Sequence, residues 1–520
     1  MGDKYSKLLK VILSHRLITL VFTIIIFVAS IRLVPLLGFS FVPSTDTGSI
    51  TVSADTDSGL TLQAGGEKAK EIEERLKKYP EVTHVYTTVS SEHISIYAKL
   101  TEKQEREKSS KQIASEMRED LKGIAGIELA VKAGSLGPSE GKDVSFVIMG
   151  NDDEALQGFA MKAKQILSQD PHAKDVAINV KTGKTETKLE VDRDKVSDLG
   201  VNTSLAAATI QALFDGIDAG KFEYAGDRYN VRVSLPDNQR KSLDNLDGIY
   251  VSGSTDKNGV NEKLVPLANV TKKVLSTSYS SIHRYDRLRQ IELSANVEGI
   301  AVGDFLEKYR NKLKDGLDIP KGVIVKDGGM NEAMSEGFAS LVTALLMGIL
   351  FMFLVMAMQF ESFLDPIAIM FSLPMALIGA VLGLYIAGSE MSIMSLIGII
   401  LLMGLVAKNG ILLIDFTKQR RNEGLSVKEA LIEAGAVRLR PILMTTLAMI
   451  FGMIPVAIAN GAGAEMRAPM GHAVIGGLIT STLLTLFIVP VVYSLLDDMK
   501  KKFRRNTKKT AYEKRDISLN

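Results

Sequence analysis

The sequence of 520 residues contains no cysteine and only 6 histidines. Without thiols the chain has no disulfide, no thiolate metal site and no cysteine nucleophile, although this does not identify its compartment. The sequence also lacks HExxH-type histidine spacing, a nucleotide-binding loop and a nucleophile motif, so we expect no bound metal, no cofactor and no enzyme in the usual sense. The formal net charge of +2 gives no support for nucleic-acid binding.

Hydrophobic residues are plentiful but unevenly distributed. They make up 46% of the chain, and the mean hydropathy of +0.14 is high for a soluble protein but low for one that lies wholly in a membrane. Long charge-free runs stand at both ends of the sequence, and the middle is charged. At this length several domains are expected, so the pattern predicts a membrane region and a separate globular region.

The charge-free runs predict six membrane spans, because about eighteen or more apolar residues can cross a bilayer as a helix. The first follows a basic start at residues 1–16, and Arg32 separates its run Leu17–Ile31 from a second run that ends at Phe41. A basic start before an apolar run also fits a signal peptide, but the continued run and the topology favour a retained anchor. The other five spans are predicted in Gly337–Met358, Pro366–Ser389, Met391–Ile414, Pro441–Ala464 and Ala468–Leu496.

Charge predicts the orientation of these spans. An even number of spans places both termini on one side of the membrane. The first residues, the link 418–440 and the tail 500–509 are all basic, so the positive-inside rule makes that side the cytoplasm. Residues 43–334 then form one large insertion outside the cytoplasm, between the first and second spans.

One cation, Lys408, stands inside an otherwise apolar span, roughly two turns from the charged end marked by Asp415 and Lys418. An ionisable residue inside a membrane helix is costly and is functional by default. A lysine that extends to a nearby interface is the alternative. Elsewhere in the spans, small residues such as Gly379 and Gly383 have the spacing of closely packed membrane helices.

The large insertion has the mixed patterning of ferredoxin-like, or split βαβ, units. Alternating apolar residues predict strands, and helical spacing predicts helices. The first unit has the order β-α-β-β-α-β, with elements at 49–56, 61–78, 82–89, 93–100, 109–124 and 127–133. A second unit begins with elements at 143–150, 154–168 and 176–180 and resumes at 290–297, 302–313 and 322–328. The turn-rich residues between its two pieces predict a protruding module, because an insertion is tolerated best at an exposed end.

We therefore predict an α-helical bundle of six membrane spans plus a large α+β region of two ferredoxin-like subdomains with an inserted module. The predicted boundaries are 1–42 for the cytoplasmic start and first span, 43–137 for subdomain 1, 138–186 and 277–334 for the two parts of subdomain 2, 187–276 for the insert, 335–497 for five further spans, and 498–520 for a basic cytoplasmic tail.

Five long motifs occur in this order: FVPSTDTGSITV, FESFLDPIAIMFSLPMALIGAVLGL, GLVAKNGILLIDF, RLRPILMTTLAMIFGMIPVAIANGAGAE and GGLITSTLLTLFIVPVVY. In these motifs and their order the chain resembles resistance-nodulation-division (RND) efflux pumps of the hydrophobe/amphiphile branch, the acriflavine-resistance type of inner-membrane transporter. The resemblance covers nearly the whole chain but only the second of the two tandem repeats of such a pump. It implies porter subdomains that line a substrate path, an insert that docks towards an outer-membrane channel or a periplasmic adaptor protein, and a trimeric assembly.

The resemblance also implies a proton relay driven by the proton gradient. Lys408 matches a lysine in the family's tenth span, and Asn409 follows it in the motif. Thr445 matches a threonine of the next span, and Arg438 a nearby arginine. In the family these residues face a pair of membrane aspartates supplied by the first repeat.

That pair of aspartates has no counterpart in this sequence. The nearest acids are Asp415, which we place at the membrane interface, and Glu390, which we expect to be solvated in a short loop. A lysine in the membrane without a counter-charge is costly, and a proton relay needs a carboxylate that titrates near neutral pH. We therefore predict a first-half RND partner with paired aspartates against Lys408. A proton on these aspartates would weaken the pairing and shift a two-state helix arrangement.

Plainer interpretations stand beside this one. Arg438 and Arg440 also suit anchors at the cytoplasmic interface. The hydroxyls of Thr445 and Thr446 suit bonds to carbonyls one turn earlier, as is common in membrane helices. For His472 a packing or solvated role is the expectation.

Three functions stay open from the sequence. The first is a half-size subunit of a proton-motive-force-driven efflux transporter for amphiphilic or hydrophobic compounds. The second is an accessory subunit of the protein-export machinery, which shares the topology but not the motifs. The third is a non-transporting scaffold or remnant of a split pump. The irregular spacing of Met352, Met356 and Met358 does not favour a copper or silver exporter.

Overall fold

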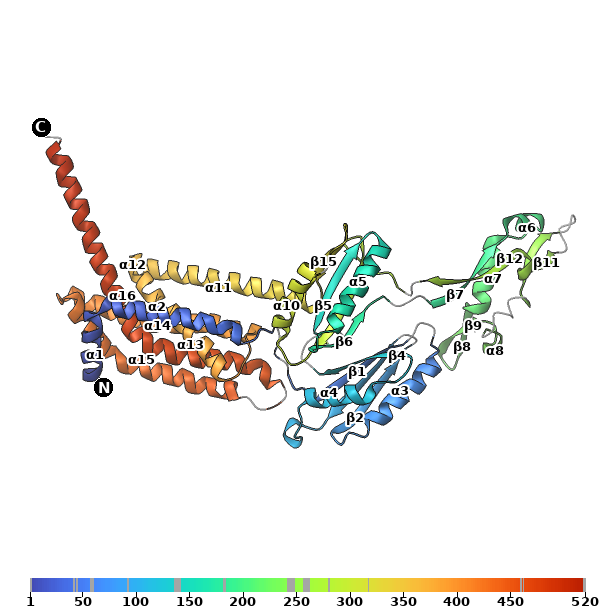
Figure 1. Cartoon of the computed structure of the whole chain (residues 1–520), viewed down its shortest axis with the longest axis horizontal. Coiled ribbons are helices and arrows are strands. Elements are labelled where there is room, and N and C mark those ends of the chain that lie inside the picture. The colour runs from blue at the N-terminus through green and yellow to red at the C-terminus, as the bar shows by residue number, and fades with distance from the viewer. Residues whose placement is uncertain are drawn as a thin grey trace. The chain divides into compact units, whose positions relative to one another are not determined.

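The computed structural model describes residues 2–40, 43, 45–56, 60–90, 93–134, 142–180, 184–240, 248–255, 262–278, 281–316, 318–458, 461 and 463–517. The chain divides into two compact units. The first comprises Met1–Val180 and Ile282–Asn520, and the second is Lys181–Ser281. The first unit contains the apolar helices and two α+β subdomains, and the second contains short strands and helices (Figure 1).

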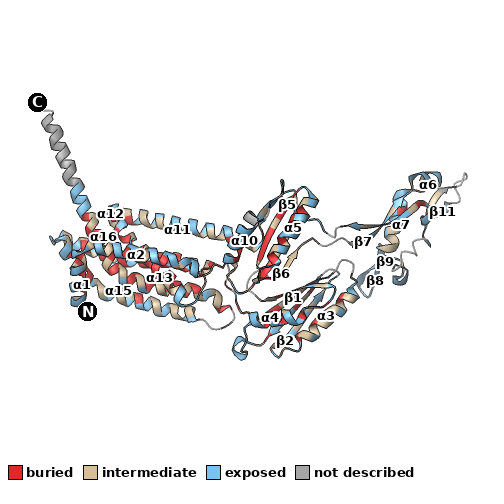
Figure 2. Cartoon of the chain, in the orientation of Figure 1, coloured by how far each residue is buried: buried red, intermediate tan, exposed pale blue. Residues whose placement is uncertain are grey.

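Within the described residues, six helical segments are long and apolar enough to cross a membrane, as predicted. A helix suits such runs because its backbone polar groups bond within the segment, where lipid offers no partner. The central helices bury most of their surface in the bundle, and the outer ones expose it (Figure 2). The segments are α2 (Arg16–Leu33) with the short helix η1 (Val34–Leu36), α11 (Met330–Phe360), α12 (Leu364–Met370) continued by α13 (Ser372–Ile386), α14 (Ile393–Asn422), α15 (Val427–Ile458) and the apolar part of α16 (Ala464–Ile517).

Two of these helices differ most from the predicted runs. α15 begins at Val427 rather than Pro441, because its first turns carry charged residues that a search for apolar runs passes over. It also ends at Ile458, before the predicted Ala464. Helix α16 continues as helical backbone to Ile517, through residues predicted to be a tail.

Glycines bring α13 and α16 together, which confirms the packing role predicted for Gly379 and Gly383. A β-carbon on Gly383 would lie 2.5 Å from the carbonyl oxygen of His472 and 3.0 Å from the Cα of Gly476. Gly379 is equally close to the backbone of Gly476 and Gly477. Because only glycine permits this approach, the two helices touch along their backbones.

The basic start of the chain forms a helix of its own, α1 (Gly2–Ser14), which we did not predict. Tyr5, Leu9 and Leu13 line one face and are buried against the bundle. The Tyr5 hydroxyl donates to the carbonyl of Leu486 at 2.7 Å. That carbonyl lies four residues before Pro490, which has no N–H to donate to it, so Tyr5 replaces the missing helical hydrogen bond.

Subdomain 1 has the predicted β-α-β-β-α-β order. Its strands form an antiparallel sheet in the order β2-β3-β1-β4, which is the ferredoxin-like arrangement. Alternate residues Ile50, Val52 and Ala54 of β1 are fully buried under both helices. The elements are β1 (Ser49–Thr56), α3 (Leu62–Leu76), β2 (Val82–Val89), β3 (His93–Leu100), the short η2 (Lys103–Glu105), α4 (Ser110–Leu121) and β4 (Ile127–Ala133).

Subdomain 2 repeats this arrangement from two separate stretches of the chain. Its sheet has the order β6-β14-β5-β15, with the short β13 added beside β14. The core is built on Phe146, Phe305 and Tyr309. The strand predicted at 176–180 begins three residues earlier and ends two residues earlier in the structure. The elements are β5 (Val144–Gly150), α5 (Asp153–Ser168), β6 (Ala173–Ile178), β13 (Arg284–Tyr285), β14 (Leu288–Val297), α10 (Val302–Gly316) and β15 (Ile324–Asp327).

The second compact unit, Lys181–Ser281, is wider than the predicted insert 187–276. This unit is inserted in the sequence between β6 and β14. These two strands are antiparallel neighbours in the sheet of subdomain 2. Its small core includes Val251, Val265 and Leu267. Its three strand pairs are β7 (Lys184–Val191) with β12 (Thr271–Ser278), β8 (Ile217–Tyr224) with β9 (Asp227–Val233) and β10 (Tyr250–Thr255) with β11 (Glu262–Pro266), and its helices are α6 (Arg193–Asp198), α7 (Thr203–Phe214), α8 (Asp237–Arg240) and α9 (Leu267–Val270).

Candidate functional site

Lys408 lies in the middle of α14, and its side chain is exposed on the surface of the bundle. Among the described residues it has no ion pair. The cations at the end of the same helix differ, because Lys418 lies 3.1 Å from Asp365 and Arg421 lies 3.0 Å from Asp497. Lys408 is therefore a cation within an apolar span, and none of the acids in the described residues forms an ion pair with it.

Unlike Lys408, the next residue, Asn409, is buried. Its residue is only 2% exposed, and neither atom of its side-chain amide has a hydrogen-bond partner in the described part of the chain. Consecutive residues on a helix point about 100° apart, because a turn takes 3.6 residues. Lys408 thus faces outward and Asn409 faces the interior of the bundle.

The packing of α14 on α15 places the other predicted relay residues. The guanidinium of Arg438 lies 4.9 Å from the ring centre of Phe416. Arg420 pairs with Glu433 at 3.1 Å, so the two helices are antiparallel. Eight residues back from Phe416 is Lys408, and eight residues on from Arg438 is Thr446. Lys408 and the two threonines Thr445 and Thr446 are therefore at one level of the bundle.

Arg438 itself is about 12 Å further towards the charged end of the bundle, since each residue of a helix rises about 1.5 Å. Its Nε is buried without a hydrogen-bond partner in the described residues. Arg440, also considered as an anchor, is exposed. Lys408, Asn409 and Thr445 thus lie at about the same height along the bundle, and Arg438 lies about two turns away.

The two neighbouring threonines differ in their partners. The hydroxyl of Thr445 donates to the carbonyl of Ile442 at 3.1 Å, which is the local bond expected of a membrane threonine. The hydroxyl of Thr446 lies instead 3.2 Å from that of Thr482 on α16. Thr446 is buried and links two helices, so the local bond expected for it was wrong.

The nearest acids do not approach Lys408. Asp415 is exposed seven residues further along α14 and accepts from the amide of Gln419 at 2.9 Å. Glu390 lies in the loop before α14, where it is half-buried and lines a cavity, and its solvation stays a prediction. His472, expected to pack or be solvated, is half-buried with its Nδ1 2.9 Å from the Ser389 hydroxyl.

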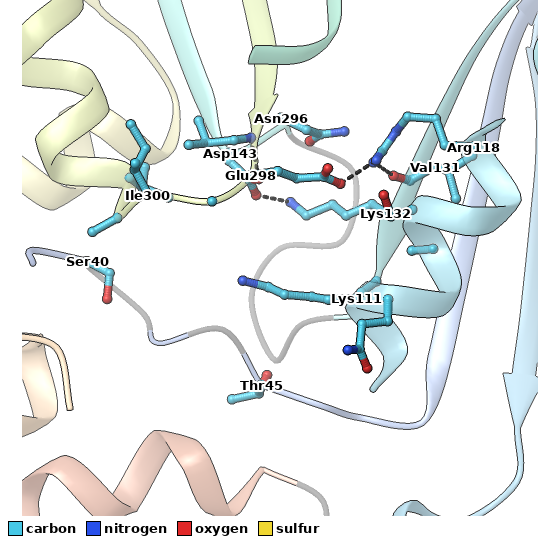
Figure 3. Close-up of a pocket in the computed structure, with 18 of the residues that line it drawn as sticks. Ser40, Thr45, Lys111, Arg118, Val131, Lys132, Asp143, Asn296, Glu298 and Ile300 are labelled. Atoms are coloured by element: carbon cyan, nitrogen blue, oxygen red, sulfur yellow. Dashed lines mark hydrogen bonds and ion pairs between the residues drawn. The ribbon is translucent and has the colours of Figure 1, made fainter. Parts of the chain in front are cut away.

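That cavity, of about 330 Å³, lies between subdomains 1 and 2 and reaches the loop before α14. Its walls carry aliphatic side chains such as Val131 and Ile300 together with charged ones. Figure 3 shows Lys111, from α4, extending into this space. Lys111 is exposed and has no ion pair among the described residues.

Ion pairs across the cavity tie the two subdomains together. Arg118 of α4 lies 3.1 Å from Asp175 of subdomain 2. It also pairs with Glu298 of the same subdomain (Figure 3). Lys132 of β4 lies 3.1 Å from Asp143. The side chains of Arg118 and Asp175 are only 10% and 5% exposed, so this pair is shielded from water. These contacts hold the two subdomains together across this cavity, which we call the cleft.

The carboxylate of Asp46 holds the chain in place just before the first strand of subdomain 1. Asp46 pairs with Arg106 and accepts from the backbone N–H of Ser110 at 3.0 Å and of Gly48 at 3.1 Å. Burial raises the pKa of Asp46, but the hydrogen bonds from Arg106 and Ser110 lower it by more and hold it well below its usual range. The neighbouring Thr45 lines the cleft, so this centre positions one wall.

Backbone contacts connect the cleft to α14. Phe39 and Met391 form a parallel β-bridge, in which Met391 N–H donates to the carbonyl of Gly38 at 2.9 Å. The carbonyl of Phe39 in turn accepts from Gly303 N–H of α10 at 2.7 Å. Two backbone hydrogen bonds, through residues 38 and 39, therefore link the loop before α14 to α10, whose first residue lines the cavity. Lys103 of η2 also pairs with Glu465 at the start of α16.

Six apolar spans, with two ferredoxin-like subdomains between the first and second, define an RND-type membrane transporter repeat. The chain belongs to the AcrB/AcrD/AcrF family, whose model matches residues 1–497.

Relatives and a solved structure agree with this assignment. The cobalt-zinc-cadmium resistance protein CzcA of Cupriavidus metallidurans is 29% identical over 95% of this chain and 48% of that protein. The multidrug resistance protein MdtC of Cronobacter sakazakii is 27% identical over 90% of this chain and 46% of that protein. A crystal structure of a heavy metal efflux pump matches with a TM-score of 0.80 at 25% identity, over 96% of this chain and 51% of that one. The chain spans about half the length of the curated relatives it matches.

Proposed function

We propose that this chain is the second-repeat half of a proton-motive-force-driven efflux transporter, working with a first repeat that supplies carboxylates to Lys408. Lys408, Asn409 and Thr445 form the relay level, and Asp415 is a secondary candidate. The first repeat is expected on a partner chain, and we propose an inner-membrane location with both termini in the cytoplasm. No cofactor beyond the proton gradient is part of the proposal.

One observation carries the proposal: Lys408 is exposed in the apolar part of α14, and no acid in the described part of the chain pairs with it. A bare ammonium facing lipid is costly. A partner helix that brings carboxylates to the exposed face removes this cost and creates a group that titrates. Protonation of those carboxylates would weaken their attraction for Lys408 and favour a second arrangement of α14.

A change in the position of α14 can be transmitted to the cleft. The β-bridge between Phe39 and Met391, with the hydrogen bond from Gly303 to Phe39, links the start of α14 to the first turn of α10. We propose that the cleft is part of the substrate path and that substrates are amphiphilic or hydrophobic compounds. Its mixture of aliphatic and charged walls suits a molecule with an apolar body and a polar end.

Metal ions are the other substrate class, favoured by the names of CzcA and of the heavy metal pump. Within the described residues no group of three or more His, Cys, Asp or Glu side chains is placed to hold a metal ion. We therefore place amphiphiles first and let the transport assay decide. Through Lys181–Ser281 we propose docking to an adaptor and an outer-membrane channel, in a trimeric assembly.

The test is transport by the chain purified together with a first-repeat partner and reconstituted in vesicles with an imposed pH gradient. Lys408→Ala should abolish gradient-driven export of a fluorescent amphiphile while the partner still co-purifies. Lys428→Ala is the matched control, because it removes an exposed cation at the start of α15. Undiminished export by Lys408→Ala would sink the proposed relay.

The same vesicles separate the remaining alternatives. Export of Zn²⁺ or Cd²⁺ without export of the amphiphile would replace the proposed substrate class with metals. Failure to co-purify any chain with membrane carboxylates, together with no transport, would favour a scaffold or a remnant of a split pump.

A further inference from the structure

Most of the charged side chains that line the cleft between subdomains 1 and 2 are already paired. The charged residues of its lining are Lys111, Arg118, Lys132, Asp143, Glu298 and Glu390. Lys132 lies 3.1 Å from Asp143, and Arg118 pairs with Glu298. Within the described residues this leaves one cation, Lys111, and one acid, Glu390, without an ion pair.

Lys111 is the cation that the cleft leaves available to a ligand. It belongs to the first turn of α4, and its side chain is exposed. Figure 3 shows it extending from α4 into the cleft, towards the wall that carries Ile300 and Ser40. The N-terminal end of a helix carries a partial positive charge, which adds to that of the ammonium. An anionic group beside Lys111 gains from both charges, and no ion pair between described residues has to break.

The opposite wall adds a buried hydroxyl. Ser40 is only 4% exposed, and its Oγ has no hydrogen-bond partner in the described part of the chain. It lines the same cavity as Lys111. Buried polar groups are nearly always hydrogen-bonded, so this wall also favours a polar group within the cleft.

Aliphatic side chains from both subdomains line the rest of the cleft. Val131 comes from β4 of subdomain 1, and Ile300 and Val302 lie just before and at the start of α10 in subdomain 2. They can cover the apolar body of a ligand from two sides. The volume of about 330 Å³ is at the lower end of the range of small-molecule pockets, about 300–1,000 Å³. The cleft therefore suits a small amphiphile with a single chain.

Glu390, the other unpaired charge, disfavours an anion beside the loop before α14. A β-carbon on Gly38 would lie 3.8 Å from the Cγ of Glu390 and 3.7 Å from a carboxylate oxygen of Asp304. Two acids are thus close together at this place, and both repel an anion. A negative head group is favoured at Lys111 instead.

We propose that the cleft selects amphiphiles with an anionic head group and that Lys111 binds this group. The inference rests on the proposed function, in which the cleft is part of the substrate path, and it narrows the substrate class. The ammonium of Lys111 attracts the head group while the aliphatic walls cover the chain. A cationic head group would be repelled by Lys111 and would need Glu390 as its partner.

Protection of a cysteine in the cleft measures binding without transport. The chain has no native cysteine, so the variant Ile300→Cys is labelled at one site. In the full-length chain in phosphatidylcholine nanodiscs, dodecane sulfonate should slow this labelling at a lower concentration than dodecanol or dodecyltrimethylammonium, which have the same chain length. Equal protection by the three probes would show that the cleft does not distinguish head-group charge. Protection by none of them would exclude the cleft as an amphiphile site.

Substitutions of Lys111 test its role in the same assay. Lys111→Met should raise the half-protecting concentration of dodecane sulfonate about fivefold, the effect of losing a partly exposed ion pair, and should leave that of dodecanol unchanged. Lys111→Arg keeps the charge and should keep the preference. Lys99→Met is the matched control, because Lys99 is an exposed lysine on β3 that does not line the cleft. Unchanged protection by the sulfonate in Lys111→Met would overturn the assignment.

The remaining outcomes separate this inference from its alternatives. Strongest protection by dodecyltrimethylammonium, lost in Glu390→Gln, would assign the cleft to cationic amphiphiles. The assay needs neither a pH gradient nor a first-repeat partner. A failure of export while the sulfonate still protects would therefore count against the relay at Lys408 alone, and a missing head-group preference with intact export would count against Lys111 alone.

Discussion

The porter subdomains and the membrane bundle differ in whether their charged and polar groups have ion-pair or hydrogen-bond partners. In the porter region, Arg106 and Arg118 each face carboxylates and backbone groups that satisfy them. In the bundle, Lys408 has no acid beside it, and Asn409 has no hydrogen bond among the described residues. Within the described residues, these arginines of the porter region are therefore paired, whereas Lys408 and Asn409 of the bundle are not.

The largest loss of stability is expected for a substitution of Arg106, and it tests whether the ion pairs of the porter region stabilise it. Arg106→Met leaves the carboxylate of Asp46 buried without its cation, and breaking such a pair costs about 3–5 kcal/mol. Hydrogen exchange in β1 and α4 should report that loss as easier opening of subdomain 1. Lys77→Met, which removes an exposed pair with Glu73, should change exchange by less than about 1 kcal/mol. Equal effects from both variants would mean that Asp46 does not depend on Arg106.

The ion pairs across the cleft come next. Arg118→Met leaves Asp175, only 5% exposed, without its cation and should cost about 1.5–3 kcal/mol. Labelling of cysteines introduced at Lys111 and Ile300 should also become faster, because the cleft opens more readily. The chain has no native cysteine, so the labels report only these sites. Lys122→Met, at the residue that follows α4, is the control, and unchanged labelling in Arg118→Met would show that the cleft is held by other contacts.

Acid should weaken subdomain 1 progressively. The pKa of Asp46 is lowered in the folded state, so its contribution is present above the unfolded value of about 3.9 and is lost as the pH falls below it. The melting temperature followed through a probe on β1 should therefore drop below about pH 4. Asp46→Asn should flatten this part of the profile. A profile identical in both proteins would assign the acid sensitivity to other groups.

The smallest effect is expected at Lys408 in the chain without its partner. Because Lys408 has no acid to lose, Lys408→Met should leave the melting temperature in detergent unchanged or slightly raised. Lys418→Met removes a paired cation from the same helix and should lower it. A loss from Lys408→Met as large as that from Lys418→Met would reveal a partner for Lys408 within this chain.

Local patterns predicted most of the fold. The spans follow from uninterrupted apolar runs, and both ferredoxin-like units follow from alternation and helical spacing within short windows. The helix α1 was missed although Tyr5, Leu9 and Leu13 recur every four residues, because the basic residues between them dominated the interpretation. The start of α15 was missed for the same reason.

The site was only partly predictable. The resemblance pointed to Lys408, Asn409 and Thr445, which the structure brings to one level. That Lys408 faces outward and Asn409 inward depends on which helices pack against α14, and no local window contains this information. The ion pairs of Arg118 join residues 57 and 180 positions apart in the sequence, so the cleft could not be inferred from spacing.

The position of the second compact unit has a consequence for chain entropy. Lys181–Ser281 leaves and re-enters subdomain 2 at neighbouring antiparallel strands, β6 and β14, where a short hairpin turn would also close the chain. Closing a flexible loop becomes only about 0.6 kcal/mol more costly with each doubling of its length. Replacing a four-residue turn by a hundred residues would then cost about 3 kcal/mol, and less when the ends of the inserted unit are already held together by β7 and β12. Units of different size and surface can therefore be exchanged at this position while the sheet that lines the cleft stays the same.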